Sequence, residues 1–131
     1  MFLDASALCA VLLAEDDAEV YDAQIAGAAA PITSPVAIFE AVLAVARVGR
    51  GDIGSARRAV DAYLAVSNVK IVAIGEPELA RALDAFDRFG KGRHPARLNL
   101  GDCFAYACAR VHGTALLFKG DDFSQTDITA A

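Results

Sequence analysis

The chain has 131 residues, of which 56% are hydrophobic, and it carries a formal net charge of −5 at neutral pH. This length predicts one domain spanning residues 1–131 with enough apolar residues for a core, and no apolar segment is long enough to cross a membrane. The acidic balance argues against a protein that coats nucleic acid, which would be basic, but not against a nuclease whose carboxylates bind a cation.

Turn residues and hydrophobic periodicity divide the chain into alternating strands and helices. In chain order, the predicted elements are a strand at 1–3, helices at 5–13 and 18–28, a strand at 32–34, helices at 35–48 and 53–66, a strand at 70–73, helices at 76–89 and 100–112, a strand at 115–118 and a last strand near Ile128. Pro35, with Ser34 as the N-cap, marks one helix start. Strands that alternate with helices predict an α/β fold, a three-layer α/β/α sandwich with a mostly parallel sheet.

The N-terminal region resembles a secretory signal only in being apolar from residue 5 to residue 14. No basic segment precedes it, and no small-residue cleavage site follows it. Cys9, Cys103 and Cys108 are an odd number of cysteines without the spacing of metal ligands, and each lies in an apolar segment predicted to be helical. Buried free thiols suit a reducing compartment, so we predict a cytoplasmic protein.

Asp4 closes the first predicted strand and directly precedes the first predicted helix. Ligands of open α/β sheets bind beyond the carboxyl ends of the strands, so Asp4 stands where a metal ligand would lie. Its alternative role is to N-cap the helix that begins at Ala5. Ser6 could orient a metal-bound water or Asp4 itself, or it could bond only to the local backbone.

Glu40 is the only charged residue between Pro35 and Ala46, in a helix that is apolar nearly all round. Such a helix is predicted to be buried, and a lone buried carboxylate is costly unless a cation compensates it. The alternative to a metal is a salt bridge to an arginine such as Arg47 or Arg110.

Asp102 is the only acid of the predicted helix that begins at Leu100. It could also complete a capping box with Asn99, which would account for it without a metal. Asp121 and Asp122 follow the last core strand, where the alternative is a solvated turn.

Together, these segments each place an acid at a strand exit or on a buried helix, and such positions converge at one edge of a parallel sheet. Carboxylates crowded into one place repel one another without a cation. Ligands that offer only oxygen select hard cations, so we predict Mg²⁺ or Mn²⁺. These ions can activate water and stabilise the leaving oxygen in phosphodiester hydrolysis.

Several segments resemble one known family in combination. They are Phe2 to Leu8, Thr33-Ser34-Pro35 through Glu40, Lys91-Gly92-Arg93-His94, Leu98 to Phe104, Leu116 to Phe123, and Thr126-Asp127-Ile128. Over essentially its whole length, the chain resembles PIN-domain ribonucleases of the VapC toxin type. The resemblance implies an endoribonuclease toxin that dimerises, is held inactive by a small antitoxin, and cuts RNA with Mg²⁺ or Mn²⁺.

The resemblance also carries over the family's acids to Asp4, Glu40 and Asp102. We expect Asp4 and Asp102 to be the principal metal ligands, with Glu40 adding charge or binding through water. Many relatives have a further Asp within a Thr-x-Asp pattern, at a position that is Gly120 here. We therefore predict Asp122, rather than Asp121, as the fourth acid, because the family has an Asp directly before the aromatic residue that is Phe123 in this chain.

Basic residues form two groups along the chain. We predict that Lys91, Arg93 and Arg97 contact RNA phosphates from the loop before the Asp102 helix, the alternative being a solvated loop. The second group consists of Arg47, Arg50, Arg57 and Arg58. The apolar excess in so small a chain also predicts a homodimer, with the helices at 35–46 and 53–66 as candidate contacts.

Other protein classes also place an aspartate after a first strand. Haloacid-dehalogenase-like phosphatases need a second Asp two residues later, where this chain has Ser6. Response-regulator receivers need a phosphoacceptor Asp after a middle strand, and here residues 70–73 are followed by Ile74-Gly75. The remaining alternative is a non-catalytic PIN-like binding or scaffold protein, which we rank below the nuclease because that class would have lost some of the acids.

Overall fold

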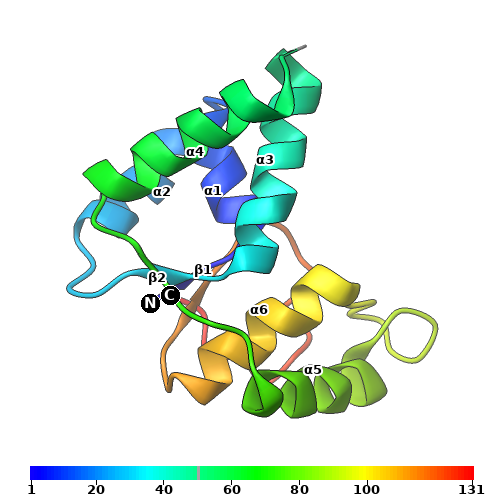
Figure 1. Cartoon of the computed structure of the whole chain (residues 1–131). Coiled ribbons are helices and arrows are strands. Elements are labelled where there is room, and N and C mark those ends of the chain that lie inside the picture. The colour runs from blue at the N-terminus through cyan, green and yellow to red at the C-terminus, as the bar shows by residue number, and fades with distance from the viewer. Residues whose placement is uncertain (50) are drawn as a thin grey trace.

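The computed structural model describes residues 1–49 and 51–131, and Arg50 of the second basic group lies outside the described residues. The elements, labelled as in Figure 1, are β1 (Phe2–Leu3), α1 (Ala5–Leu12), α2 (Ala18–Ala26), β2 (Ile32–Thr33), α3 (Pro35–Gly49), α4 (Ile53–Val66), β3 (Lys70–Ile71), α5 (Glu76–Phe89), α6 (Leu100–Val111) and β4 (Leu116–Leu117). Except for the last strand, the predicted elements are confirmed in kind and order, with differences of a few residues at their ends. None of the described helices has the length and apolarity needed to cross a membrane.

The strands form one parallel sheet in the order β3-β2-β1-β4. Phe2 of β1 is in register with Ile32 of β2 on one side and with Leu116 of β4 on the other. The last strand, predicted near Ile128, is instead an isolated bridge between Leu116 and Ala130. The pairing lies slightly later than predicted, because the residues that bond to Leu116 are Thr129 and Ala131.

Neighbouring residues of the central strands point to opposite faces of the sheet and build two cores. Phe2 and Leu116 pack with α5 and α6, whereas Leu3 and Leu117 pack with α1, α3 and α4. Figure 1 shows the same division, with α1 to α4 on one side of the sheet and the α5–α6 pair on the other. This arrangement confirms the predicted three-layer α/β/α sandwich.

The starts of the helices bring polar residues to the carboxyl edge of the sheet. Asp4 follows β1 and caps α1, because its side chain accepts a hydrogen bond from the backbone N–H of Ser6. Ser34 follows β2, and its hydroxyl accepts a bond from the N–H of Ala37 at 3.2 Å. Pro35 suits the first helical position because its missing N–H would have no partner there. The helices α1 and α3 therefore begin side by side at this edge.

Candidate active site

Asp4 lies in the interior, with 5% of its surface exposed. Its Oδ2 accepts hydrogen bonds from both the backbone N–H, at 2.9 Å, and the hydroxyl of Ser6. Burial raises the pKa of Asp4, and the nearby charge of Asp122 raises it further, while the bonds from Ser6 act in the opposite direction. Asp4 is therefore a helix cap, as the alternative proposed, and also a buried carboxylate without a cationic partner among the described residues.

Ser6 joins the first turn of α1 to the segment after β4. Its hydroxyl donates to Asp4 and accepts a bond of 3.0 Å from the backbone N–H of Lys119. The hydroxyl therefore bonds to Asp4, as one of the alternatives from the sequence proposed, and its backbone partner is the distant Lys119, not a neighbouring residue.

Glu40 projects from α3 towards α6, and its carboxylate lies directly against the backbone of Gly101. A Cβ at position 101 would overlap both Glu40 oxygens, so glycine is required for this approach. Burial raises the pKa of Glu40 to about 7, with further contributions from the charges of Asp4 and Asp102. The predicted alternative of a salt bridge is wrong for Arg110, which pairs with Asp127 at 2.9 Å, and Glu40 takes part in no ion pair within the described part of the chain.

Asp102 forms the capping box that its position suggested. Its Oδ2 accepts a hydrogen bond of 2.8 Å from the backbone N–H of Asn99, and its own backbone N–H donates one of 3.0 Å to Asn99 Oδ1. Burial nevertheless raises the pKa of Asp102 to about 6, and the charges of Asp4 and Asp122 add to the increase, while the Asn99 bond lowers it. The capping box fixes the carboxylate at the start of α6 without neutralising it.

Asp121 and Asp122 are both exposed, but their surroundings differ. Asp122 is close enough to raise the pKa of both Asp4 and Asp102. The backbone carbonyl of Asp121 accepts hydrogen bonds from the N–H and the hydroxyl of Ser124, at 3.1 Å and 2.6 Å. Phe123 is buried and packs against Phe118 with ring centroids 4.9 Å apart, which anchors the segment next to Asp122.

The acids of four segments therefore converge on one region at the carboxyl edge of the sheet. Their donor atoms are all carboxylate oxygens, and the raised pKa values of Glu40 and Asp102 show that each negative charge is opposed by burial and by its neighbours. Either a proton or a hard cation would relieve this repulsion, so the residues fit a divalent metal ion. Among the described residues, no three acidic, His or Cys side chains are close enough together to hold an ion directly.

The predicted RNA-contacting residues form a separate, exposed group. Lys91, Arg93 and Arg97 lie in the loop at 90–98 that joins α5 to the Asp102 helix, and Figure 1 shows this loop extending away from the body of the molecule. Arg93 is ion-paired with Asp87 at 2.7 Å on the surface. The structure places these residues beside the start of α6 but not among the acids.

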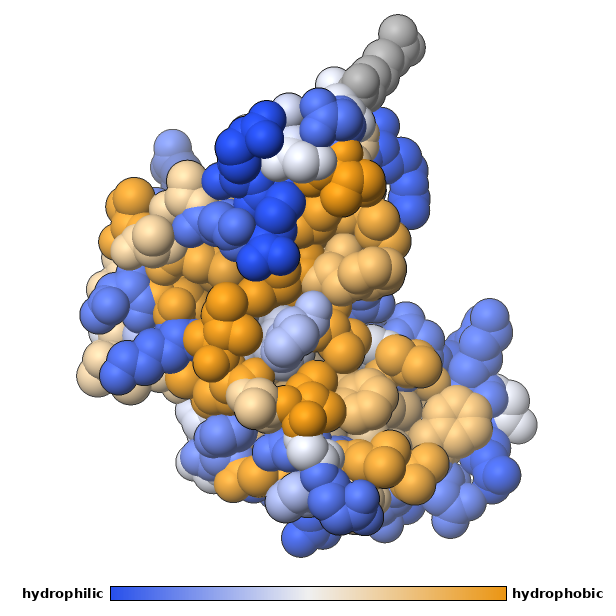
Figure 2. All heavy atoms as spheres, in the orientation of Figure 1, coloured by the Kyte–Doolittle hydropathy of each residue, from blue (hydrophilic) through white to orange (hydrophobic). Residues whose placement is uncertain are grey.

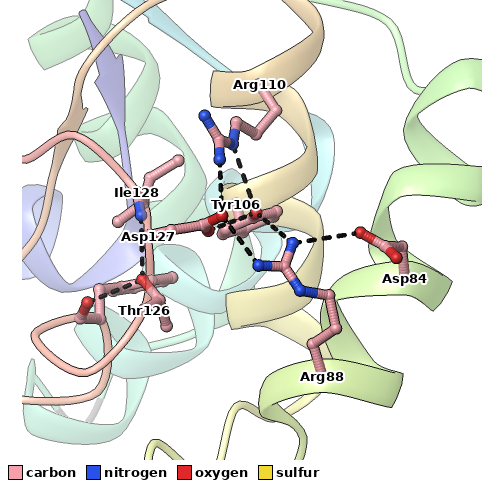
Figure 3. A network of polar contacts seen from close by, with 8 residues as sticks. Asp84, Arg88, Tyr106, Arg110, Thr126, Asp127 and Ile128 are labelled. Carbon is pink, nitrogen blue, oxygen red and sulfur yellow. Dashed lines mark hydrogen bonds and ion pairs between the residues drawn. The ribbon is translucent and has the colours of Figure 1, made fainter.

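Two polar clusters near the site were not predicted. In Figure 3, Asp127 accepts hydrogen bonds from Tyr106 and Arg88 at 2.7 and 2.8 Å and is ion-paired with Arg110 at 2.9 Å. The Arg88 and Tyr106 bonds lower the pKa of Asp127 to about 2. The other cluster joins Lys119 to two acids of the α1–α2 turn, Glu15 and Asp17. The sequence shows a lysine after an apolar strand and a run of acids near residue 16, but it does not show that their side chains form ion pairs.

Comparisons with known proteins agree with this geometry. A family model described as PIN domain matches residues 1–128. A VapC ribonuclease of Rhizobium meliloti is 42% identical, over 97% of this chain and 98% of its own length. Ribonuclease VapC of Mycolicibacterium smegmatis is 39% identical, over 99% of this chain and 98% of its own length. The chain therefore belongs to the PIN-domain family and, within it, to the VapC-type ribonucleases.

Solved structures support the fold. Mycobacterium tuberculosis VapC20, described as a sarcin-ricin loop cleaving toxin, has a TM-score of 0.78 at 20% identity, covering 99% of this chain and 97% of that chain. A toxin–antitoxin complex from Klebsiella pneumoniae contains a chain with a TM-score of 0.71 at 17% identity, covering 99% of this chain and 95% of that chain.

Proposed function

We propose that this chain is a Mg²⁺- or Mn²⁺-dependent endoribonuclease, the toxin of a toxin–antitoxin pair, which hydrolyses RNA phosphodiester bonds in the cytoplasm through one domain spanning residues 1–131. The observation that carries this proposal is the group of carboxylates at the sheet edge, in which Asp4 is buried and Glu40 and Asp102 are partly buried, and which has no cationic partners in the described part of the chain. A protein does not retain such repulsion for stability alone, whereas a site for a hard cation needs it.

In this proposal Asp4 and Asp102 hold the ion, and Glu40 adds negative charge or binds through water. Asp122 orients the attacking water or supports a second ion. The bound ion would supply a water nucleophile at neutral pH and balance the charge that develops on the phosphate. The protein holds these carboxylates in position. Hydrogen bonds from Ser6 hold Asp4, the capping box holds Asp102, and the packing of Phe123 holds the backbone next to Asp122.

The central test compares Asp4→Asn with wild type in RNA cleavage and in thermal unfolding with and without Mn²⁺. Asparagine is as good an N-cap as aspartate, so the fold should persist while cleavage is lost. Mn²⁺ should raise the melting temperature of the wild type, since a ligand of the native state stabilises it, and should do so much less in the variant. Asp84→Asn, an exposed acid on α5, is the matched control.

Wild-type cleavage rates in Asp4→Asn would refute the assignment of Asp4. Stabilisation of the wild type by Mn²⁺ without cleavage of any RNA would instead favour the non-catalytic PIN-like binding protein.

Recognition of RNA is assigned to Lys91, Arg93 and Arg97, with Ser6 near the scissile bond. Neutralising one phosphate contact should flatten the salt dependence of RNA binding by about one unit of slope. Arg93→Gln is the most informative change, because its loss of the exposed Asp87 ion pair costs little stability. An unchanged slope in Arg93→Gln and Arg97→Gln would remove this loop from the interface.

The protein partners are proposed to be a second copy of this chain and a cognate antitoxin. Figure 2 shows apolar side chains on both sides of a hollow between the α3–α4 half and the α5–α6 half. Phe39, Leu83 and Leu100 are each more than 60% exposed; Phe39 lines an apolar pocket with residues of α3 and α4, and Leu83 and Leu100 line another between α5 and α6. Contiguous exposed apolar surface indicates a protein interface. Light scattering on the purified chain tests the dimer, and co-purification with the product of the adjacent gene tests the antitoxin.

A further inference from the structure

Lys119 is tied to the molecule at both its side chain and its backbone. It lies two residues after Leu117, the end of β4. Its ammonium group contacts the carboxylate of Glu15 and lies 2.6 Å from Asp17, both in the turn between α1 and α2. These bonds raise the pKa of Lys119 and lower that of Asp17, so both groups stay charged over a wide pH range.

The backbone of the same residue reaches the candidate active site. The N–H of Lys119 donates to the hydroxyl of Ser6 at 3.0 Å, and that hydroxyl donates to Asp4. The preceding carbonyl, that of Phe118, accepts a long bond of 3.4 Å from Tyr21 of α2. One residue therefore connects the α1–α2 turn, the Asp4 bonding network and the segment that continues to Asp122.

The segment after Lys119 is fixed on its far side by Phe123, which is buried and packs against Phe118. Gly120 has a φ of +103° and starts a turn, and Asp121 and Asp122 are exposed. Further along the chain, Asp127 is held between α5 and α6 in the network of Figure 3. The segment is thus anchored at both ends, and Lys119 provides the anchor on the side of Asp4.

We propose that Lys119 is a positioning residue for the ribonuclease site: its ion pairs with Glu15 and Asp17 fix the segment that carries Asp122 against Ser6 and Asp4. This inference rests on the proposed function, in that it assumes that these carboxylates perform catalysis. Exposed ion pairs contribute little to stability, but displacing a reacting group by about 1 Å can cost about a hundredfold in rate. The ion pairs should therefore matter much more for the rate than for the fold.

The test compares Lys119→Met and Lys119→Arg with wild type in the full chain. Cleavage of a fluorogenic RNA at saturating Mn²⁺ gives kcat and KM separately. Lys119→Met should lower kcat by about tenfold or more and leave KM within about twofold, because RNA contacts are unchanged. Lys119→Arg should recover most of kcat, since a guanidinium can also pair with two carboxylates. Arg81→Met, an exposed cation on α5 without an ion pair among the described residues, controls for the lost charge.

Amide hydrogen exchange of metal-free protein supplies a readout that does not depend on activity. Exchange across residues 118–123 should become faster in Lys119→Met, and not in Lys119→Arg or Arg81→Met. The double variant Glu15→Gln/Asp17→Asn should reproduce the defects of Lys119→Met, and combining both changes should add no further loss.

Three results would overturn the inference. The first is a rise in KM with kcat unchanged, which would make Lys119 an RNA contact. The second is an unchanged kcat, and the third is unchanged exchange in residues 118–123. If wild type cleaves no RNA, the proposed function fails, whereas faster exchange in Lys119→Met would still show that the ion pairs hold this segment.

Discussion

Two sets of carboxylates in this molecule have opposite surroundings. Asp127 is half-exposed, yet it is ion-paired with two guanidinium groups and accepts a hydrogen bond from a phenol, and its pKa falls to about 2. Glu40 and Asp102, which are more buried, have no cation beside them within the described residues, and burial raises their pKa values to about 7 and about 6. The surroundings therefore favour the ionised carboxylate at Asp127 and disfavour it at Glu40 and Asp102.

The difference separates structural acids from candidate functional acids. Asp127 joins the C-terminal segment to α5 and α6, so its charge is satisfied within the protein. The charges at the sheet edge accept hydrogen bonds but have no cationic partner within the described residues, so compensation comes from outside, as protons or a cation. Perturbed pKa values in a group of acids at a strand exit therefore indicate a functional site, whereas the large shift of Asp127 does not.

After the loss of cleavage expected for Asp4→Asn, the largest expected effect comes from Gly101→Ala. The added methyl would overlap the Glu40 carboxylate, which is the end of a flexible side chain and can move away. Cleavage should fall by about tenfold or more because Glu40 is displaced, while stability should hold, since Ala in a helix gains about 0.5–1 kcal/mol over Gly. Cleavage rates and melting temperatures of the variant measure both effects.

Gly49→Ala at the end of α3 is the control for this substitution, because its methyl would meet no atom of the described residues within 4 Å. Equal cleavage rates in Gly101→Ala and wild type would show that the position of Glu40 is not important for catalysis.

Glu40→Gln should change the pH dependence of stability in metal-free protein. Glu40 loses its proton near pH 4.5 when unfolded and near pH 7 when folded. Between these values the folded state binds more protons than the unfolded state, so the free energy of unfolding should fall as pH rises. Glu40→Gln should reduce this slope and be the more stable form above pH 7, by on the order of 1 kcal/mol or more.

Urea unfolding at a series of pH values, with a chelator present, measures the slope. If the free energy of unfolding of Glu40→Gln falls with pH as steeply as that of wild type, the pH dependence arises from another group. Mn²⁺ should remove much of the difference between the two proteins at high pH, because the ion compensates the same charge.

Asp127→Asn should have the smallest effect, a loss of about 1 kcal/mol in the free energy of unfolding at pH 7 with cleavage nearly unchanged. The low folded pKa means that the stabilisation is present above the unfolded value of 3.8 and is lost as pH falls towards about 2. The two proteins should therefore become equally stable in acid. Loss of cleavage comparable to that of Gly101→Ala would place the C-terminal segment within the catalytic machinery.

Sequence reasoning located the acids more accurately than it located their partners. Asp4 and Asp102 were recognised from their places at a strand exit and a helix start, and each has the capping role that was the alternative. Their catalytic roles remain predictions. The strands were predicted one or two residues too long, because hydrogen bonding to a neighbour, and not β propensity, sets where a strand ends.

The contacts that could not be predicted join residues far apart in the chain. Lys119 meets Glu15 more than a hundred residues away, and Glu40 lies against Gly101 of another helix. Arg110 was considered as a partner of Glu40 but pairs with Asp127. Residue types alone do not distinguish these pairings, because every acid is an equally good partner for an arginine until the packing of the helices fixes which side chains are within reach.

The sequence by itself determined the order of strands and helices, the parallel α/β class and the family, because hydrophobic periodicity, caps and motifs are local properties of the chain. Only the tertiary structure decided which carboxylates are buried without cations and which are paired. Burial and charge pairing depend on what packs around a side chain after the sheet has brought β1, β2 and β4 together. The candidate site is therefore encoded locally as residue types and becomes a site only through the convergence of strand ends at one edge of the sheet.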